Sequence, residues 1–544
     1  MKREPSKYQK DILDWVKNGS GNCVVDALAG TGKSTTLEMI AQNLPDKSRM
    51  LFLAFNKHIK DELLQKEGLQ EILNSNRLKI MTVNSLGNST VLEYGKNKDG
   101  KSTVELCPNK LTKLILDDVI YECMLRENKL PQNYDSIIVG LIKRHAKTCI
   151  DLVRSKLIDY KKVTEIDKLI DVEHLFMFPK NVLVDFKIPH LDWSWIVSEA
   201  IEREVEMFQE TGEYDFIDQV YLPIVLNLPL PQWVRWYTDF VCVDESQDLS
   251  VLQQRFISKL QYINSYNTTR YIFVGDKRQA IYKFNGADST SIENIEKYFH
   301  TKEFPLNICY RCPVKALDLA REYVPQIENR QNAIEGAVTT INDSEVADLA
   351  QAGDLIMARK NKDLIKVFLQ ILKKRKKVYF KKADFLNTIL NNIKSRKKIK
   401  TMKDLRDFIN KEKEKQNELK QEEDSQKSVL DVEDEDVFST MLSLVQFFEQ
   451  NAKEMEYPLT IQGFFTFISD IISNEPSKDC ITVGSIHSMK GLEANRVFIV
   501  NYFEMPYNFG MGEDYFTQEK NLKYIAETRT KNELFLCVND MDED

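Results

Sequence analysis

The sequence has no uninterrupted run of about 18 apolar residues, the length that a membrane-spanning helix needs. Its opening stretch, MKREPSKYQKDILDW, lacks the apolar core of a secretory signal. Nine cysteines are scattered without a disulfide framework, which is typical of a reducing interior. We therefore expect a protein of the bacterial or host cytoplasm, or of the nucleus in a eukaryote, without a membrane partner.

Internal repeats and proline-rich linkers are absent as well, which argues against solenoid and linker-rich architectures. A length of 544 residues predicts roughly three or four domains. The net charge of −8 argues against a nucleic-acid coat over the whole surface. It leaves a locally basic groove possible, because local charge decides phosphate binding.

The segment VVDALAGTGKSTTLEM, which starts at Val24, has the pattern of a phosphate-binding loop. Its frame reads ALAGTGKS over 27–34, with Ala27 where the pattern G-x-x-x-x-G-K-[ST] has its first glycine. An apolar strand is expected before the loop and a helix after it. Lys33 would reach the β- and γ-phosphates, and Ser34 would ligate Mg²⁺. The polyphosphate would be surrounded by the loop backbone, at Ala29, Gly30, Thr31, Gly32, Lys33, Ser34 and Thr35.

Carboxylates and a glutamine follow two further predicted strands. DFVCVDESQDLS is an apolar strand that ends in Asp244 and Glu245, where Asp244 can hold Mg²⁺ and Glu245 can polarise the attacking water. YIFVGDKRQ ends in a turn whose Gln279 can sense the γ-phosphate. Later, LKYIAETRTKNELFLCV predicts a helix that carries Arg529 and then a strand.

Ten segments in order along the chain resemble the UvrD/Rep/PcrA family of superfamily 1A DNA helicases. They are SKYQKDILDW, ALAGTGKST, FLAFNKHIKDEL, TVNSLG, VDESQDLS, GDKRQAIYKFNGA, YRCP, ARKNKDL, SIHSMKGLE and YIAETRTK. AFNK and TVNSLG look most like the branch with F-box DNA helicases and phage relatives. The resemblance implies an α/β fold of two RecA-like P-loop NTPase lobes with parallel sheets, each interrupted by a largely helical inserted domain.

The resemblance also implies roles in an ATP site in the cleft between the lobes. Gln9 would read the adenine edge, Tyr310 would stack on the ring and Glu493 would hold the ribose. Glu245 would be the catalytic base, and Arg311 and Arg529 would be arginine fingers. The phosphates and Mg²⁺ would be managed by Lys33, Ser34 and Asp244, and Gln279 would link the γ-phosphate to DNA.

A track for single-stranded DNA is implied across the tops of both lobes. Phe55 and Phe284 are candidate stacking residues, although Phe55 could instead be core at a strand end. Candidate backbone contacts are Asn56, Lys57, Asn84, Ser85, Asn285 and His487. Three positions depart from the family pattern: Asn285 replaces an arginine, Asn84 a histidine and Gln518 a glutamate. The first two remove positive charge from the track.

The same reasoning divides the chain into four parts. The first lobe is expected at 1–90 and 205–305, around a first inserted helical domain at 91–204. The second lobe is expected at 306–375 and 478–544, around a second insertion at 376–477. That insertion holds basic runs and the polar stretch from 410 to 437, which is a solvated helix or a mobile linker.

These features predict an ATP- and Mg²⁺-dependent helicase that moves 3′ to 5′ on single-stranded DNA and acts at single/double-strand junctions. Repair, replication and recombination roles, and a loading or recombination protein as partner, are all open. An alternative is a DNA-stimulated ATPase that strips proteins from single strands with little unwinding. A binding module that has lost catalysis is disfavoured by the intact Lys33 and Glu245.

Three weaker signals point elsewhere. The pair Cys309 and Cys312 has zinc-like spacing, but no second pair of ligands is near in sequence. VDFK at 184–187 and IDYK at 158–161 resemble part of a nuclease motif without its metal-binding constellation. The three histidines at 145, 174 and 190 are too far apart in sequence to suggest a metal site.

Overall fold

The computed structural model describes residues 4–99, 104–127, 136–173, 175, 191–263, 269–281, 286, 288, 290–381, 384–395, 399–420, 429–473, 479–508 and 512–539. The chain forms two compact units, residues 1–307 and 308–544. None of the helices in these described ranges is long and apolar enough to cross a membrane.

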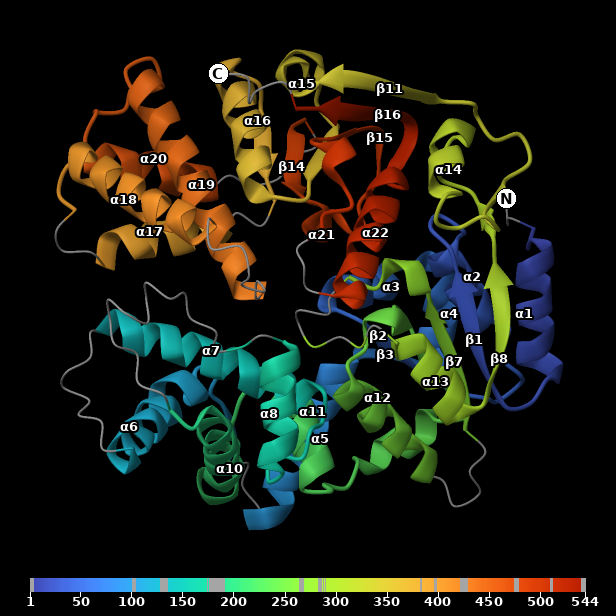
Figure 1. The fold of residues 1–544 in the computed structure, drawn as a ribbon. Helices are drawn as coiled ribbons and strands as arrows, with labels where there is room; N and C mark the ends of the chain where they lie inside the picture. The colour runs from blue at the N-terminus through green and yellow to red at the C-terminus, as the bar shows by residue number, and fades with distance from the viewer. Residues whose placement is uncertain are drawn as a thin grey trace. The chain divides into compact units, whose positions relative to one another are not determined.

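The first unit is built on a six-stranded sheet in the order β3-β2-β6-β7-β1-β8, in which every neighbouring pair is parallel (Figure 1). Four of the strands are almost wholly buried apolar runs, as expected where helices cover both faces of a parallel sheet. The strands are β1 (Asn22–Ala27), β2 (Met50–Ala54), β3 (Leu78–Thr82), β6 (Phe240–Val243), β7 (Arg270–Gly275) and β8 (Thr301–Leu306).

Helices of the first unit fall into two groups. Those of the lobe are α1 (Lys7–Asn18), α2 (Lys33–Gln42), α3 (Lys57–Gln65), α4 (Glu67–Asn74), α5 (Val83–Asp99), α11 (Asp218–Val225), α12 (Val251–Ser258) and α13 (Ser291–Phe299). Those between α5 and α11 are the π-helical η1 (Leu111–Ile115), α6 (Leu116–Arg126), α7 (Ser136–Ser155), α8 (Val163–Val172) and α10 (Trp193–Thr211). A short parallel pair, β4 (Glu105–Leu106) and β5 (Glu213–Tyr214), joins the two ends of this inserted segment.

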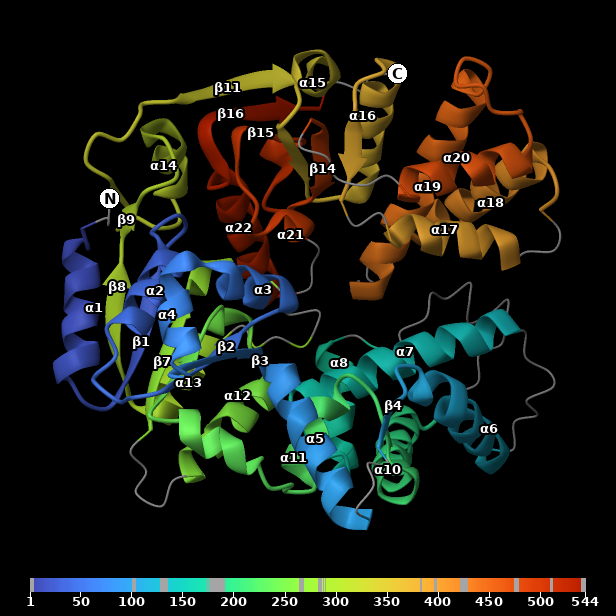
Figure 2. The same cartoon turned by 180° about the vertical axis from the view of Figure 1, so that it is seen from behind.

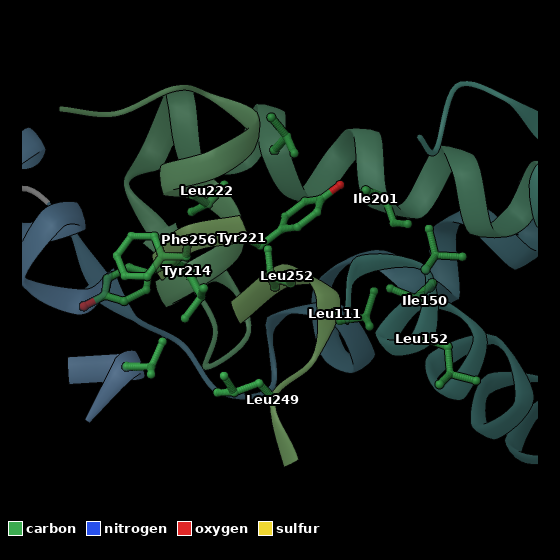
Figure 3. Close-up of a cluster of buried hydrophobic side chains, with 14 of the residues drawn as sticks. Leu111, Ile150, Leu152, Ile201, Tyr214, Tyr221, Leu222, Leu249, Leu252 and Phe256 are labelled. Atoms are coloured by element: carbon green, nitrogen blue, oxygen red, sulfur yellow. The ribbon is translucent and has the colours of Figure 1, made fainter. Parts of the chain in front are cut away.

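The inserted helices share one hydrophobic core with the lobe. Leu111, Ile150 and Ile201 come from the insertion, and they belong to the same buried cluster as Leu252 and Phe256 of α12 (Figure 3). A separate cluster lies on the other face of the sheet, where α1, α2 and α4 pack. The insertion is therefore fixed to the lobe by apolar burial, at about 25 cal/mol per Å² of buried area.

The second unit has its own six-stranded parallel sheet, in the order β11-β16-β15-β12-β14-β13 (Figure 2). Its strands are β11 (Ala337–Asn342), β12 (Leu355–Ala358), β13 (Val378–Phe380), β14 (Ile481–Ser485), β15 (Ala494–Ile499) and β16 (Thr530–Val538), and a separate pair is formed by β9 (Ile308–Cys309) and β10 (Glu328–Asn329). The helices are α14 (Val314–Ala320), α15 (Asp343–Leu349), α16 (Asn361–Lys373), α21 (Ile486–Met489) and α22 (Glu513–Glu527), with α17 (Asp384–Ser395), α18 (Met402–Lys420), α19 (Val429–Asn451) and α20 (Ile461–Ser473) inserted.

The predicted fold class is confirmed: two α/β units, each built on a parallel sheet, carry helical insertions. Two details differ from expectation. Val378–Phe380, which the sequence prediction put in the second insertion, pairs with β14 in the sheet. Arg529 lies just beyond α22 rather than on it, because that helix ends at Glu527. Within the polar stretch, residues to 420 and from 429 are helical, and 421–428 lie outside the described ranges. The domain boundaries stay a prediction.

Candidate nucleotide site and nucleic-acid interface

The candidate site residues of the first unit lie at one edge of its sheet. All six strands run the same way, so the segments that follow them meet at the carboxyl edge. The glycine-rich loop follows β1, Asp244 follows β6, and the turn with Gln279 follows β7. Phe55 follows β2 and Asn84 follows β3, further along the same edge.

Two glycines of the loop have backbone angles that favour glycine. Gly30 has φ 70° and Gly32 has φ 82°, in the left-handed region where a side chain is disfavoured. Ala27, which replaces the first glycine of the pattern, is instead the last residue of β1 and pairs with Leu306. Its extended backbone accepts a Cβ, so this departure leaves the loop geometry intact.

Lys33 joins the loop to the two carboxylates. It is the first residue of α2, and its Nζ pairs with Glu245 and lies 3.8 Å from Asp244 Oδ1. Burial alone would lower the pKa of Lys33, but Glu245 and Asp244 outweigh it and raise the pKa above its ordinary value. Burial raises the pKa of Asp244 to about 6, and the Lys33 amine limits that rise. The Lys33 amine is therefore stabilised in its charged form by the two carboxylates beside it.

The backbone of Glu245 is held in an unusual conformation. Its φ of 50° and ψ of 43° put a non-glycine residue in the left-handed region, which costs roughly 1–2 kcal/mol. Gln247 fixes the side chain by donating to Glu245 Oε2 at 2.5 Å, and its own Oε1 accepts the Asp276 N–H at 3.1 Å. Strain of this kind persists where the surroundings over-determine it, as at active sites.

The turn after β7 is tied back to β1. Arg278 Nη1 lies 2.8 and 2.7 Å from the two carboxylate oxygens of Asp26, just before the loop. Gln279 is buried, and its Nε2 donates to Asp276 Oδ2 at 2.9 Å. Gln279 therefore lies at the same edge of the sheet as the glycine-rich loop, with its amide bonded inside its own turn, and its role as a γ-phosphate sensor stays a prediction.

Gln9 is buried on α1 and both ends of its amide are bonded. Nε2 donates to Thr36 Oγ1 at 2.9 Å, and Oε1 accepts the Ser6 N–H at 2.9 Å, which closes a capping box. The Thr36 bond links α1 to the helix that starts at Lys33. Reading of an adenine edge by Gln9 stays a prediction.

The second unit gathers its predicted nucleotide residues at the amino ends of two neighbouring strands. Arg311 Nε lies 2.5 Å from Glu493 Oε2, just before β15, and Arg311 Nη1 donates to the Thr528 carbonyl at 3.2 Å. Glu493 also pairs with Lys531 at 2.7 Å. Burial would raise the pKa of Glu493, but Lys531 and Arg311 together hold it below its usual range.

The two predicted arginine fingers differ in exposure. Arg529 is 2% exposed, and its Nε donates to the Ile525 carbonyl at 2.9 Å. Arg311 is half-buried, and the neighbouring Tyr310 is exposed. Arg311 and Tyr310 therefore lie at the surface of their unit, whereas Arg529 is buried and hydrogen-bonded within it.

The predicted nucleic-acid residues are only partly brought together. Phe55 is half-buried, and Asn56 caps α3 by accepting the Ile59 N–H at 2.9 Å, with exposed Lys57 next to it. Ser85 is exposed and shares a 2.8 Å hydrogen bond with Thr82. His487 lies in α21 of the second unit, at the carboxyl end of β14. Phe284 and Asn285 lie outside the described residues, as do VDFK and two of the histidines.

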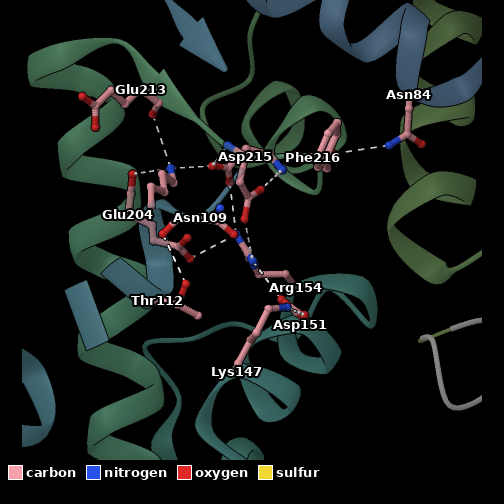
Figure 4. A network of polar contacts seen from close by, with 12 residues as sticks. Asn84, Asn109, Thr112, Lys147, Asp151, Arg154, Glu204, Glu213, Asp215 and Phe216 are labelled. Carbon is pink, nitrogen blue, oxygen red and sulfur yellow. Dashed lines mark hydrogen bonds and ion pairs between the residues drawn. The ribbon is translucent and has the colours of Figure 1, made fainter. Parts of the chain in front are cut away.

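Phe216 is a candidate interface residue that the sequence prediction missed. It lies between β5 and α11 and is 55% exposed, so its ring is accessible from solvent. Asn84 Nδ2 donates to its carbonyl oxygen at 3.3 Å, so Phe216 lies next to Asn84, one of the residues of the predicted track (Figure 4). Sequence patterns could not identify this residue, because the hydrogen bond that places it joins residues 132 positions apart in the chain.

A buried ion cluster holds the loop that presents Phe216. Arg154 of α7 pairs with Glu204 at 3.0 Å, Asp215 at 3.1 Å and Asp218 at 3.3 Å (Figure 4). Lys110 pairs with Asp218 at 2.5 Å. Asp215 and Asp218 also exchange backbone-to-carboxylate hydrogen bonds of 3.0 and 2.8 Å on either side of Phe216.

The same carboxylates are close enough to one another to hold a metal ion. Their oxygens lie within 4.8 Å of one another, the single such group found among the described residues. The two cations of the cluster already occupy this space, because Lys110 and Arg154 contact the carboxylates directly. We interpret the group as an ion-pair cluster that joins the inserted helices to α11.

Arg154→Met is expected to destabilise the first unit by about 3–5 kcal/mol, because it leaves buried carboxylates without their main cation. Arg203→Met is the matched control, since Arg203 on α10 pairs with the partly exposed Glu122 and a pair of this kind contributes about 0–1 kcal/mol. Denaturant unfolding and hydrogen exchange in α7 and α10 measure the difference. Equal midpoints for the two variants would contradict the assignment.

Two family profiles match the chain. One, described as the UvrD/REP helicase N-terminal domain, matches residues 8–300, and the other, described as the UvrD-like helicase C-terminal domain, matches residues 293–541. Together they cover both units and the segments that carry the candidate site.

Individual relatives are similar at low identity. A probable DNA helicase II homolog of Mycoplasma genitalium is 23% identical over 96% of this chain and 83% of its own length. F-box DNA helicase protein 1 of Schizosaccharomyces pombe is 24% identical over 56% of this chain and 31% of that protein. ATP-dependent DNA helicase PcrA of Bacillus subtilis is 27% identical over 25% of this chain and 18% of that protein.

Proposed function

This chain belongs to the UvrD/Rep family of DNA helicases, and from that premise we propose that it is an ATP-driven motor on single-stranded DNA. The motor moves 3′ to 5′, couples each turnover to strand movement, and separates the strands of a duplex that it meets. The polarity rests on the family resemblance.

One observation carries the proposal. Lys33, Asp244 and Glu245 converge at the carboxyl edge of a parallel sheet whose neighbouring strands present Phe55 and Asn84 at that same edge. The residues proposed to bind phosphate and those proposed to contact DNA therefore lie on one rigid sheet. Such an arrangement is required if ATP hydrolysis is to be coupled to movement along the DNA.

ATP is the expected substrate, and Mg²⁺ fits the oxygen donors that the site offers. Mg²⁺ prefers one or two carboxylates together with substrate phosphates, and Asp244 and the Ser34 hydroxyl are oxygen donors of the right kind. The Lys33 amine beside both carboxylates supports a cation-accepting environment. When bound, Mg²⁺ would neutralise charge on the phosphates.

The Lys33–Glu245 ion pair suggests how nucleotide binding activates Glu245 as the general base. A polyphosphate competes with Glu245 for the Lys33 amine, because both are anions within its reach. Exchange of the amine frees the Glu245 carboxylate to accept a proton from water, while Gln247 keeps it in place. Tyr310 stacks on the adenine ring, Glu493 binds the ribose, and Arg311 stabilises the phosphoryl group in transfer.

Phe216→Ala is expected to weaken binding of a single-stranded oligonucleotide about 5- to 150-fold, since stacking on an aromatic side chain contributes roughly 1–3 kcal/mol per base. Trp236→Ala is the matched control. Trp236 is 65% exposed but lies in the 3₁₀ helix Gln232–Tyr237, which precedes β6 at the opposite edge of the sheet. Fluorescence anisotropy measures both affinities, and equal losses would remove Phe216 from the track.

A forked duplex with either a 3′ or a 5′ tail tests the motor itself. ATP turnover stimulated by single-stranded DNA and unwinding from the 3′ tail are the expected results. Absence of stimulation would overturn the proposal. Stimulated turnover that clears a protein roadblock but leaves the fork intact would favour protein displacement instead.

A further inference from the structure

Two cysteines flank the residues that we assign to the nucleotide in the second unit. Cys309 ends β9, the chain bends through 310–312, and the Cys312 N–H donates to Cys309 Sγ at 3.4 Å. Both thiols are free and buried, at 0% and 2% exposure. Tyr310 and Arg311 are the two residues between them.

The second thiol belongs to the contacts that position Arg311. Cys312 Sγ donates to the Thr528 carbonyl at 3.4 Å, and Arg311 Nη1 donates to the same oxygen at 3.2 Å. Thr528 directly precedes Arg529. A covalent change at Cys312 therefore directly alters the contacts of the carbonyl oxygen that positions Arg311.

We propose that Cys309 and Cys312 form an oxidation site, at which a hydroperoxide closes a disulfide that displaces Arg311 and slows ATP turnover. The effect on turnover rests on the function proposed above. The disulfide itself requires only the two thiols.

The chemistry balances with the peroxide as the sole oxidant. The Cys309 thiolate attacks one peroxide oxygen, the O–O bond breaks, and an alcohol or water leaves as Cys309 becomes a sulfenic acid. The Cys312 sulfur then attacks Cys309 Sγ, and the sulfenic oxygen leaves as water. Two thiols lose two electrons and two protons, which the two oxygens of the peroxide take up.

The surroundings favour Cys309 as the first nucleophile. The neighbouring Cys312 thiol and backbone N–H lower the pKa of Cys309 to about 6, against the opposing effect of burial, and Arg311 contributes to the lowering. A lowered pKa favours the thiolate, which is the reactive form of a cysteine. The neighbouring Cys309 sulfur and burial raise the pKa of Cys312, as suits a resolving thiol.

Closure of the disulfide changes the contacts of the bend. Its two sulfurs must approach to about 2.05 Å, which tightens the turn that carries Tyr310 and Arg311. Cys312 also loses its S–H, so the Thr528 carbonyl loses one of its two donors. A zinc ion is a poorer explanation of the pair, because the described residues supply no third ligand beside it.

Treatment of the reduced protein with hydrogen peroxide tests the site, followed by peptide mapping and by measurement of ATP turnover with single-stranded DNA. We expect a Cys309–Cys312 disulfide, a turnover about 10-fold or more lower, as for a displaced arginine finger, and recovery with dithiothreitol. Cys309→Ser and Cys312→Ser should each lose this reversible response. Cys107→Ser should keep it, although Cys107 is the one half-exposed cysteine among the nine.

Each contrary result has a distinct meaning. Peroxide that yields no such disulfide, or a disulfide that leaves turnover unchanged, overturns the inference. A reduced parent without DNA-stimulated turnover overturns the proposed function instead, and peptide mapping then still decides whether the pair is an oxidation site.

Discussion

Glu245→Gln lowers ATP turnover by about 10²–10⁴-fold, the contribution of a general base, while binding of single-stranded DNA stays close to that of the parent. Glutamine keeps the length of the side chain, and its one amide oxygen can still accept a hydrogen bond from Lys33 or from Gln247, but it cannot accept a proton. The backbone strain at this position is unchanged, so the fold is preserved. Lys33→Ala has a similar effect on turnover for another reason, because the phosphates lose their cation.

Single-turnover ATP hydrolysis and oligonucleotide anisotropy separate these effects. Glu71→Gln is the matched control, since Glu71 lies on the exposed side of α4 in the same unit. Near-normal hydrolysis by Glu245→Gln or Lys33→Ala would mean that the nucleotide site is misassigned. Loss of DNA binding along with turnover would mean that the two functions share these residues.

Arg311→Ala lowers ATP turnover by about 10³–10⁵-fold, the range for removal of an arginine finger. The unit should tolerate the change, because Glu493 keeps Lys531 as a partner and the Thr528 carbonyl keeps Cys312. Arg311→Lys restores little, since an ammonium cannot make the forked contacts of a guanidinium. The loss should appear in kcat more than in KM, because the contact develops with the charge of the transition state.

Arg406→Ala is the matched control for this loss. Arg406 lies on α18 of the same unit, and its partly exposed pair with Glu449 at 3.3 Å contributes little to stability. Turnover of Arg311→Ala within a few-fold of the control would exclude Arg311 as a finger. Arg529→Ala would differ in kind: Arg529 is buried and bonded to backbone carbonyls, so its loss should lower stability as well.

Local sequence patterns were sufficient to predict most of the helices and strands that carry the candidate site. The strand, loop and helix around Lys33, and the strand before Asp244, follow from apolar runs and glycines within about ten residues, because these elements form from short-range periodicity. Parallel order then brings the ends of the strands together. The misplacement of Arg529 on a helix, and of Val378–Phe380 in the insertion, arose where a boundary depends on distant partners.

The sequence by itself determined the local elements of the candidate site and the family: a phosphate-loop pattern, two carboxylates after a strand, and the motifs of UvrD-like DNA helicases, all readable from contiguous segments. The tertiary structure alone decided that Phe216 lies beside Asn84, that Arg154 joins the insertion to α11, and that Cys312 shares a carbonyl with Arg311. These contacts join residues far apart in the chain, and their partners are fixed by packing, which no local periodicity encodes.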